Sequence, residues 1–101
     1  MKTIKLEDIF NIYNEILQGK ITREEAEIFA DKLIDAEDNY NLIYIPKSDE
    51  KIIWDELIFI SGIGMQDQKP DDNIKSYLYN EKDIKDHVKI IENYKNYKEK
   101  Q

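Results

Sequence analysis

The sequence has no cysteine, which excludes disulfide bonds, thiolate metal sites and a cysteine nucleophile. It has only three glycines and two prolines, and so few chain-breaking residues favour long helices over a β fold with many turns. No apolar run approaches the roughly 18 residues that a membrane-spanning helix needs. The N-terminal stretch MKTIKLEDIFNIYNE carries acids within its apolar run and lacks the core of a signal peptide. These absences predict a soluble cytoplasmic protein.

The composition is that of one globular domain with a strongly charged surface. The chain has 101 residues, of which 41% are hydrophobic and 37% are charged, so we expect a single domain over residues 1–101 with a modest core. The formal net charge is -7. This excess of acids argues against direct binding of nucleic acid or of an anionic membrane, because both require neutralising cations. It favours a basic protein partner, or it serves solubility alone.

Two helices are predicted in the N-terminal third of the chain. The segment LEDIFNIYNEILQGK, residues 6–20, has apolar residues at helical spacing, and Gly19 stands where a C-terminal cap belongs. A second helix is expected to begin after Thr22, because Thr22 and Glu25 match the capping box, in which each side chain accepts a hydrogen bond from an end amide. The expected apolar face of this helix is Ala26, Phe29, Ala30, Leu33 and Ile34.

A loop follows, and then a third helix. Residues 42–45, LIYI, form a possible short extended piece that Pro46 would end. Ser48 or Asp49 is predicted to cap the helix DEKIIWDELIFIS. That helix is apolar on nearly all sides, which is typical of a helix at the centre of a fold. We therefore expect the core to be centred on Trp54.

The last part of the chain contains a long polar loop and a fourth helix. Residues 62–76, GIGMQDQKPDDNIKS, are too polar for the core, whereas Leu78 is expected to be buried. Asn80 and Asp83 are spaced as the start of a helix. The tail, about residues 95–101, is expected to fray. The expected inner face of the fourth helix is Ile84, Val88, Ile90, Ile91 and Tyr94. The predicted fold class is all-α, a single-domain bundle of about four helices.

Signatures of catalysis and of metal binding are weak. GIG at 62–64 lacks the spacing and the lysine of a phosphate-binding loop. DAEDNYNLIYIP resembles a calcium loop in its acids, but it lacks the central glycine and has a proline where the bidentate glutamate belongs. The one histidine, His87, lies among charged residues and is expected at the surface, although it could serve as a general base in a polar pocket. We therefore predict no catalytic residue, no metal and no cofactor.

The charge is concentrated in one segment. Residues 21–50 contain nine acids and three cations, which gives -6 of the total of -7. On the second helix, five acids recur at steps of three and four, so they share one side, where like charges repel one another at a few tenths of a kcal/mol per pair. These acids are Glu24, Glu27, Asp31, Asp35 and Asp38. The last of them also lie at the negative end of the helix dipole.

An unfavourable charge pattern without local compensation is typical of a functional surface. We therefore predict that these five acids contact a basic protein partner. An aromatic anchor is expected from Tyr40 or Tyr44, and secondary contacts are expected from Asp67, Asp71 and Asp72 in the long loop. A helix face that is merely solvated explains the same pattern, and both explanations stay open.

Three segments also resemble a group of small helical bacterial proteins. These segments are ITREEAEIFADKL, IIWDELIFISGIGMQD and YLYNEKDIKDHV, and the similarity covers roughly residues 21–90. The middle motif of the group is of the form Trp-x-x-Leu-x-x-Leu, held here by Trp54, Leu57 and Ile60. Asp67 matches its loop and Tyr77-Leu78 the segment before the last helix. Phe29-Ala30 replaces the Trp-Ala that the group often carries.

Several members of this group look like immunity proteins encoded beside polymorphic or contact-dependent growth-inhibition toxins. The resemblance implies a non-catalytic inhibitor that binds a cognate toxin domain, often a nuclease. It identifies no particular toxin, and most of the matched positions are those of core or cap residues, which fix a fold and not a function. An alternative is an adaptor or regulatory module that docks on a basic subunit of another complex.

Overall fold

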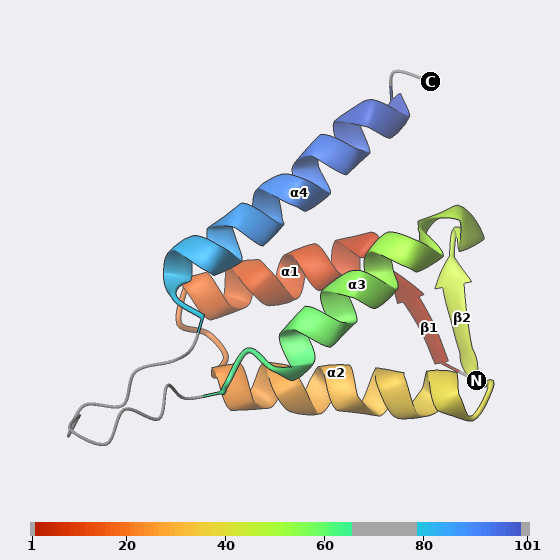
Figure 1. The fold of residues 1–101 in the computed structure, drawn as a ribbon, viewed down its shortest axis with the longest axis horizontal. Coiled ribbons are helices and arrows are strands. Elements are labelled where there is room, and N and C mark those ends of the chain that lie inside the picture. Colours follow the sequence, from red (N-terminus) through yellow and green to blue (C-terminus); the bar gives the residue numbers. More distant parts are fainter. Residues whose placement is uncertain (1, 66–78, 100–101) are drawn as a thin grey trace.

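The computed structural model describes residues 2–65 and 79–99, and it contains four α-helices and a small parallel sheet (Figure 1). In chain order the elements are β1 Lys2–Lys5, α1 Leu6–Leu17, α2 Arg23–Asp38, β2 Leu42–Ile45, a short 3-10 turn η1 at Lys47–Asp49, α3 Glu50–Ser61 and α4 Glu81–Glu99. The prediction of four helices is confirmed. The prediction of a strictly all-α fold is wrong, because the fold is mainly α with one two-stranded sheet.

The sheet joins the start of the described chain to the segment after α2. β1 and β2 are parallel, with Lys2 opposite Leu42 and Ile4 opposite Tyr44. The Lys2 backbone N–H donates to the Asn41 carbonyl oxygen at 2.9 Å. LIYI was recognisable as an extended piece, but β1 is only four residues long and has a single buried residue, Ile4. Such a short strand has no alternating pattern that would reveal it in the sequence.

Three predicted helix ends are confirmed by hydrogen bonds. At the start of α2, the Glu25 N–H donates to Thr22 Oγ1 at 3.0 Å and the Thr22 N–H donates to Glu25 Oε1 at 3.1 Å. Asn80 and Asp83 exchange the same pair of bonds at the start of α4. At the end of α1, Gly19 has a φ of 73°, the left-handed conformation that glycine adopts at no steric cost.

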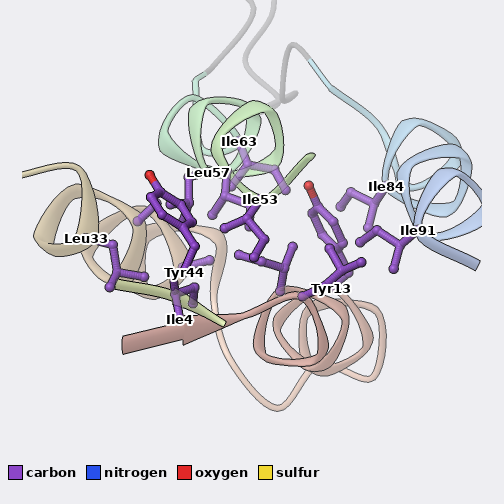
Figure 2. Close-up of a cluster of buried hydrophobic side chains, with 14 residues drawn as sticks. Ile4, Tyr13, Leu33, Tyr44, Ile53, Leu57, Ile63, Ile84 and Ile91 are labelled. Carbon is purple, nitrogen blue, oxygen red and sulfur yellow. The ribbon is translucent and has the colours of Figure 1, made fainter. Parts of the chain in front are cut away.

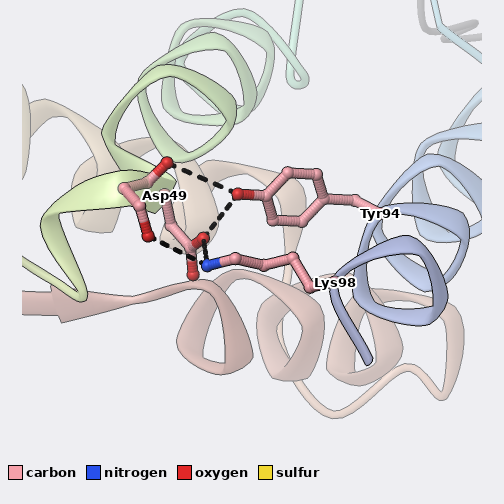
Figure 3. Close-up of polar contacts among 4 residues, drawn as sticks. Asp49, Tyr94 and Lys98 are labelled. Carbon is pink, nitrogen blue, oxygen red and sulfur yellow. Dashed lines mark hydrogen bonds and ion pairs between the residues drawn. The ribbon is translucent and has the colours of Figure 1, made fainter. Parts of the chain in front are cut away.

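Asp49 precedes α3 as predicted, but its side chain does not cap that helix. Its carboxylate accepts hydrogen bonds from the Tyr94 hydroxyl and the Lys98 ammonium, each at 2.6 Å (Figure 3). The hydrogen bond that Tyr94 donates to Asp49 raises the pKa of Tyr94, and the one that Lys98 donates to Asp49 raises the pKa of Lys98. α4 therefore runs through the segment expected to fray, as far as Glu99, with its last turns held against the start of α3.

The core lies between the sheet and all four helices (Figure 2). Its centre on α3 is Ile53, Leu57 and Ile60, which are fully buried, whereas Trp54 is only partly buried. The prediction of a core centred on Trp54 is therefore wrong, because Trp54 lies about 100° around the helix from Ile53. The other buried apolar residues are Ile4, Leu6, Ile9, Tyr13, Ala26, Ala30, Leu33, Ala36, Tyr44, Ile63, Ile84 and Ile91.

Two further predictions about the core need correction. The sequence predicts Ile63 in a polar loop, but Ile63 is fully buried directly after α3. It predicts Ile90 on the inner face of α4, but Ile90 is 48% exposed. Ile84 and Ile91 are seven residues apart and so define the buried stripe of α4, and Ile90 lies about 100° away from that stripe. Leu78 lies outside the described residues.

Candidate protein-binding surface

α2 buries one side and turns most of its carboxylates to the other. Ala26, Ala30 and Leu33 are buried against the core. The acids at steps of three and four fall on the opposite side of the helix, because the two sets of residues are out of phase in a repeat of 3.6 residues. We call this surface the acidic face, and its members are Glu24, Glu27, Asp31, Asp35 and Asp38. Glu27 is half-buried, and the other four are exposed.

The charge of the acidic face is not balanced within the helix. α2 has seven acids and two cations, and its last turn has no basic residue. In the described part of the chain, no ion pair reaches Asp31, Asp35 or Asp38. Asp35 and Asp38 also lie at the negative end of the helix dipole, where a carboxylate costs about 0.3–1 kcal/mol when exposed. A cationic partner would relieve this repulsion.

Glu27 marks the border of the acidic face on the side of α3. Its carboxylate lies directly over the backbone of Gly64, because a Cβ built on Gly64 would be 1.7 Å from Glu27 Oε1. Glu27 therefore packs against the turn that follows α3 and is less accessible than Asp31 or Asp35.

An apolar side chain lies on the same surface. Ile28 is 56% exposed, and it is a helical neighbour of Glu24 and Asp31, at steps of four and three. Sequence reasoning missed Ile28, although an isoleucine outside the apolar repeat of α2 was a visible signal. Ile28 thus places an exposed apolar side chain among Glu24, Asp31 and Lys32.

Tyr40 is held in an unusual conformation at the end of α2. The helix closes with a Schellman motif, in which the Tyr40 N–H donates to the Glu37 carbonyl at 3.0 Å and the Asn41 N–H donates to the Ala36 carbonyl at 2.7 Å. Tyr40 has a φ of 57°, in the left-handed region that disfavours residues with a side chain. Its side chain is 94% exposed. The predicted aromatic anchor is therefore presented to solvent beside Asp38.

Tyr44 does not fit the role that we predicted for it. Its side chain is buried in the core, with 8% exposure, and its hydroxyl donates to Glu37 at 3.0 Å. Burial, and then the hydrogen bond and charge of Glu37, raise the pKa of Tyr44. Tyr44 faces inward because it alternates with Ile43 and Ile45 along β2. Tyr40 is thus the accessible one of the two candidate tyrosines. The secondary candidates Asp67, Asp71 and Asp72 lie outside the described residues.

A buried polar cluster on the other side of α3 was not predicted. Glu56 is 3% exposed and accepts a hydrogen bond from the Tyr13 hydroxyl at 2.5 Å, and its Oε2 lies 2.7 Å from His87 Nδ1. Burial, together with the charge and hydrogen bond of Glu56, raises the pKa of Tyr13. His87 is half-buried and stacks on Phe59 with ring centroids 3.7 Å apart.

This cluster joins three helices, because Tyr13 lies on α1, Glu56 on α3 and His87 on α4. A signal for it was present in the sequence, since Glu56 lies on the same helix face as Ile53 and Ile60, at steps of three and four. An acid within an apolar stripe requires buried hydrogen-bond donors.

Among the residues that the structure describes, no helix is both long enough and apolar enough to cross a membrane. In the same parts of the chain, no three side chains of histidine, aspartate or glutamate are grouped so that they could hold a metal ion.

The chain is similar to a distant relative among known proteins. The chain is 30% identical over 82 residues to the uncharacterized protein YxzC of Bacillus subtilis (strain 168), a match that covers 81% of this chain. The match spans 57% of the length of that curated relative. No family model matches the chain, and no solved structure matches it either.

Proposed function

We propose that this protein is an immunity-type inhibitor, which binds a cognate bacterial toxin domain through the acidic face and Tyr40. The observation that carries the proposal is the unbalanced charge of α2, with Asp31, Asp35 and Asp38 exposed and in no ion pair with another described residue. The similarity of residues 21–90 to small helical immunity proteins supports it. The proposed partner is a basic domain, of which a nuclease with a cationic groove is the leading example.

The proposal gives each part of the surface a different role. The carboxylates attract a cationic partner at long range and raise the association rate, an effect that salt weakens. Tyr40 and Ile28 provide apolar contact area at short range, Tyr40 with a rigid ring of few rotatable bonds. The partner thus approaches along α2 and closes over its C-terminal end.

The test begins with the identity of the partner. Tagged protein is used to capture its partner from a lysate of the source organism, and the captured protein is identified by mass spectrometry. The gene of that partner is then expressed alone and together with this protein. Growth arrest by the partner alone, and rescue by co-expression, are the expected results. A partner that is harmless when expressed alone would favour the adaptor alternative.

The surface is tested with matched variants in a titration of the purified partner. The double variant Asp31→Lys, Asp35→Lys is expected to weaken binding by at least about 100-fold. The control is Asp86→Lys, Glu92→Lys, which makes the same change in net charge at exposed positions of α4. Equal affinity of the two variants would show that the partner binds elsewhere.

A further inference from the structure

The two strands of the sheet have different outer surfaces. On β1 the outward side chains are Thr3 and Lys5, and lysine on an edge strand discourages pairing with another strand. On β2 the outward side chains are Ile43 and Ile45, which are 43% and 40% exposed. β2 therefore lacks the charged residues that commonly protect a sheet edge.

In the described residues, β2 pairs with a strand along one of its two edges only. The bond from Lys2 to the Asn41 carbonyl sets the parallel ladder, in which alternate residues of β2 direct their N–H and C=O groups toward β1. Leu42 and Tyr44 then direct theirs to the other side. In the described part of the chain the sheet has two strands, so no third strand takes these groups. In Figure 1, β1 lies on one side of β2 and no other strand is drawn on its other side.

Two hollows lie beside this edge, and both are lined by Tyr44 and Glu50. One, of about 230 Å³, follows the strand and is completed by Leu42, Ile43 and Lys47. The other, also about 230 Å³, lies between α2 and α3 and is completed by Glu37, Lys51 and Trp54. If a third strand paired with β2, the side chains on its inner face would enter these two hollows.

The second hollow has the chemistry of a site for an arginine side chain. It is lined by two carboxylates, Glu37 and Glu50, and by the ring of the partly buried Trp54. Burial contributes most to the raised pKa of Tyr44, and the hydrogen bond to Glu37 and the charges of Glu37 and Glu50 raise it further. Lys51 also lines the hollow, but it is exposed and has a long flexible stem. A planar guanidinium pairs with carboxylates and stacks on an indole ring.

We propose that the open edge of β2 binds an extended peptide segment of a partner protein as a third strand, with one arginine of that segment held by Glu37, Glu50 and Trp54. Main-chain hydrogen bonds to Leu42 and Tyr44 supply the pairing, and the arginine supplies selectivity. This peptide site goes beyond the acidic face, because its residues belong to β2, to the start of α3 and to the flank of α2 that faces α3.

The probe is the peptide acetyl-Thr-Val-Arg-Val-Thr-amide. Side chains alternate along a strand, so the arginine faces the hollow while both valines lie on the side of Ile43 and Ile45. Binding is followed by two-dimensional NMR of the ¹⁵N-labelled protein in 0.15 M salt, where the Debye length is about 8 Å. We expect shifts of the amide signals of residues 42–45 and of the Trp54 indole signal.

Two control peptides and two protein variants make the test specific. A peptide with glutamate in place of arginine, and a peptide with N-methyl groups on the amides that face β2, are both expected not to bind. Glu50→Gln is expected to weaken the arginine peptide about fivefold, whereas Glu81→Gln, at an exposed position on α4, leaves its affinity unchanged. Equal binding of the arginine and glutamate peptides, or no shift at residues 42–45, would overturn the proposal.

The acidic-face variant separates this site from the proposed function. Asp31→Lys, Asp35→Lys is expected to keep its affinity for the arginine peptide even though it loses the toxin domain. Loss of peptide binding in this variant would mean that the peptide is attracted by α2 and not held at β2.

Discussion

Tyr40 and Gly19 occupy the same position in two equivalent helix ends. Each is the left-handed residue of a Schellman motif, with φ values of 57° and 73°. The Gly19 N–H donates to the Ile16 carbonyl and the Tyr40 N–H donates to the Glu37 carbonyl, at 3.1 and 3.0 Å. Glycine adopts this conformation without steric cost, whereas a residue with a Cβ pays about 1–2 kcal/mol. The chain thus keeps a costly tyrosine where it elsewhere uses glycine.

Replacing Tyr40 by glycine is therefore expected to stabilise the free protein. We predict an increase of about 1 kcal/mol in the free energy of unfolding, measured by urea denaturation, because the left-handed strain is removed. The same variant should bind the partner more weakly. Tyr40→Ala is the control, since it removes the ring but keeps the Cβ. A Tyr40→Gly variant less stable than Tyr40→Ala would contradict the assignment of strain.

A second prediction concerns the charge at the end of α2. Asp38→Lys places a cation near the negative end of the helix dipole, so the free energy of unfolding should rise by about 0.3–1 kcal/mol at low salt. The gain should shrink in high salt because mobile ions screen it. Asp86→Lys, an exposed position toward the first half of α4, should show no such gain. Equal effects of the two variants would rule out the dipole as the cause.

The buried cluster makes a third prediction. Tyr13→Phe removes the hydroxyl that donates to the buried Glu56, which leaves that carboxylate with one donor fewer. We expect a loss of about 1–3 kcal/mol in the free energy of unfolding. Tyr97→Phe, at a position that is 62% exposed, is the control and should be neutral. In a double-mutant cycle with Glu56→Gln, the two losses should not add, because one variant removes the donor and the other the charge of the acceptor of the same hydrogen bond.

Alkaline pH should destabilise the protein in a way that depends on Tyr13. The pKa of Tyr13 is raised in the folded state above its ordinary value of 10.0. Below pH 10, the folded and unfolded states both hold the proton, so the stabilisation is complete. As pH rises above 10, only the unfolded chain loses the proton of the Tyr13 hydroxyl. The free energy of unfolding therefore falls by up to about 1.4 kcal/mol per pH unit through Tyr13.

Urea denaturation from about pH 9 to pH 11 measures this slope. The slope should be shallower in Tyr13→Phe by the contribution of one proton. Equal slopes for the parent and the variant would mean that Tyr13 titrates alike in both states.

The contact between η1 and α4 gives a fifth prediction. Asp49→Asn weakens the bonds from Tyr94 and Lys98, so the last turns of α4 should open more often. We expect amide hydrogen exchange in residues 92–99 to be about fivefold faster, with little change in α2. Ser48→Ala is a control, because it removes only the weaker contact of the Ser48 hydroxyl with Lys98. Unchanged exchange in Asp49→Asn would show that α4 is held by its apolar face alone.

Local signals predicted the helices because each helix end is determined by a few adjacent residues. Thr22 with Glu25, and Asn80 with Asp83, form their bonds within one turn, so spacing in the sequence was sufficient. Pairing at long range was not visible. Ile4 meets Tyr44 across 40 positions of the chain, and Asp49 meets Lys98 across 49. No local pattern encodes such distances.

For the candidate surface too, the sequence predicted the local features but not those that depend on tertiary structure. The acidic face followed from helical periodicity alone, and the structure places four of its five carboxylates in solvent. The choice between Tyr40 and Tyr44 depended on the alternation of β2 and on the end of α2, which required tertiary structure. Ile28 and Glu56 broke the apolar pattern of their helices in opposite directions, one by being exposed and the other by being buried.

The sheet has a practical consequence for the design of fusions. Because Lys2 is bonded to Asn41, the residue after Tyr40, any peptide attached ahead of Lys2 emerges next to the C-terminal end of the acidic face. The end of α4 points away from α2 in Figure 1. An affinity tag at the N-terminus would thus lie close to the acidic face and shield it, whereas a tag at the C-terminus would leave the acidic face accessible.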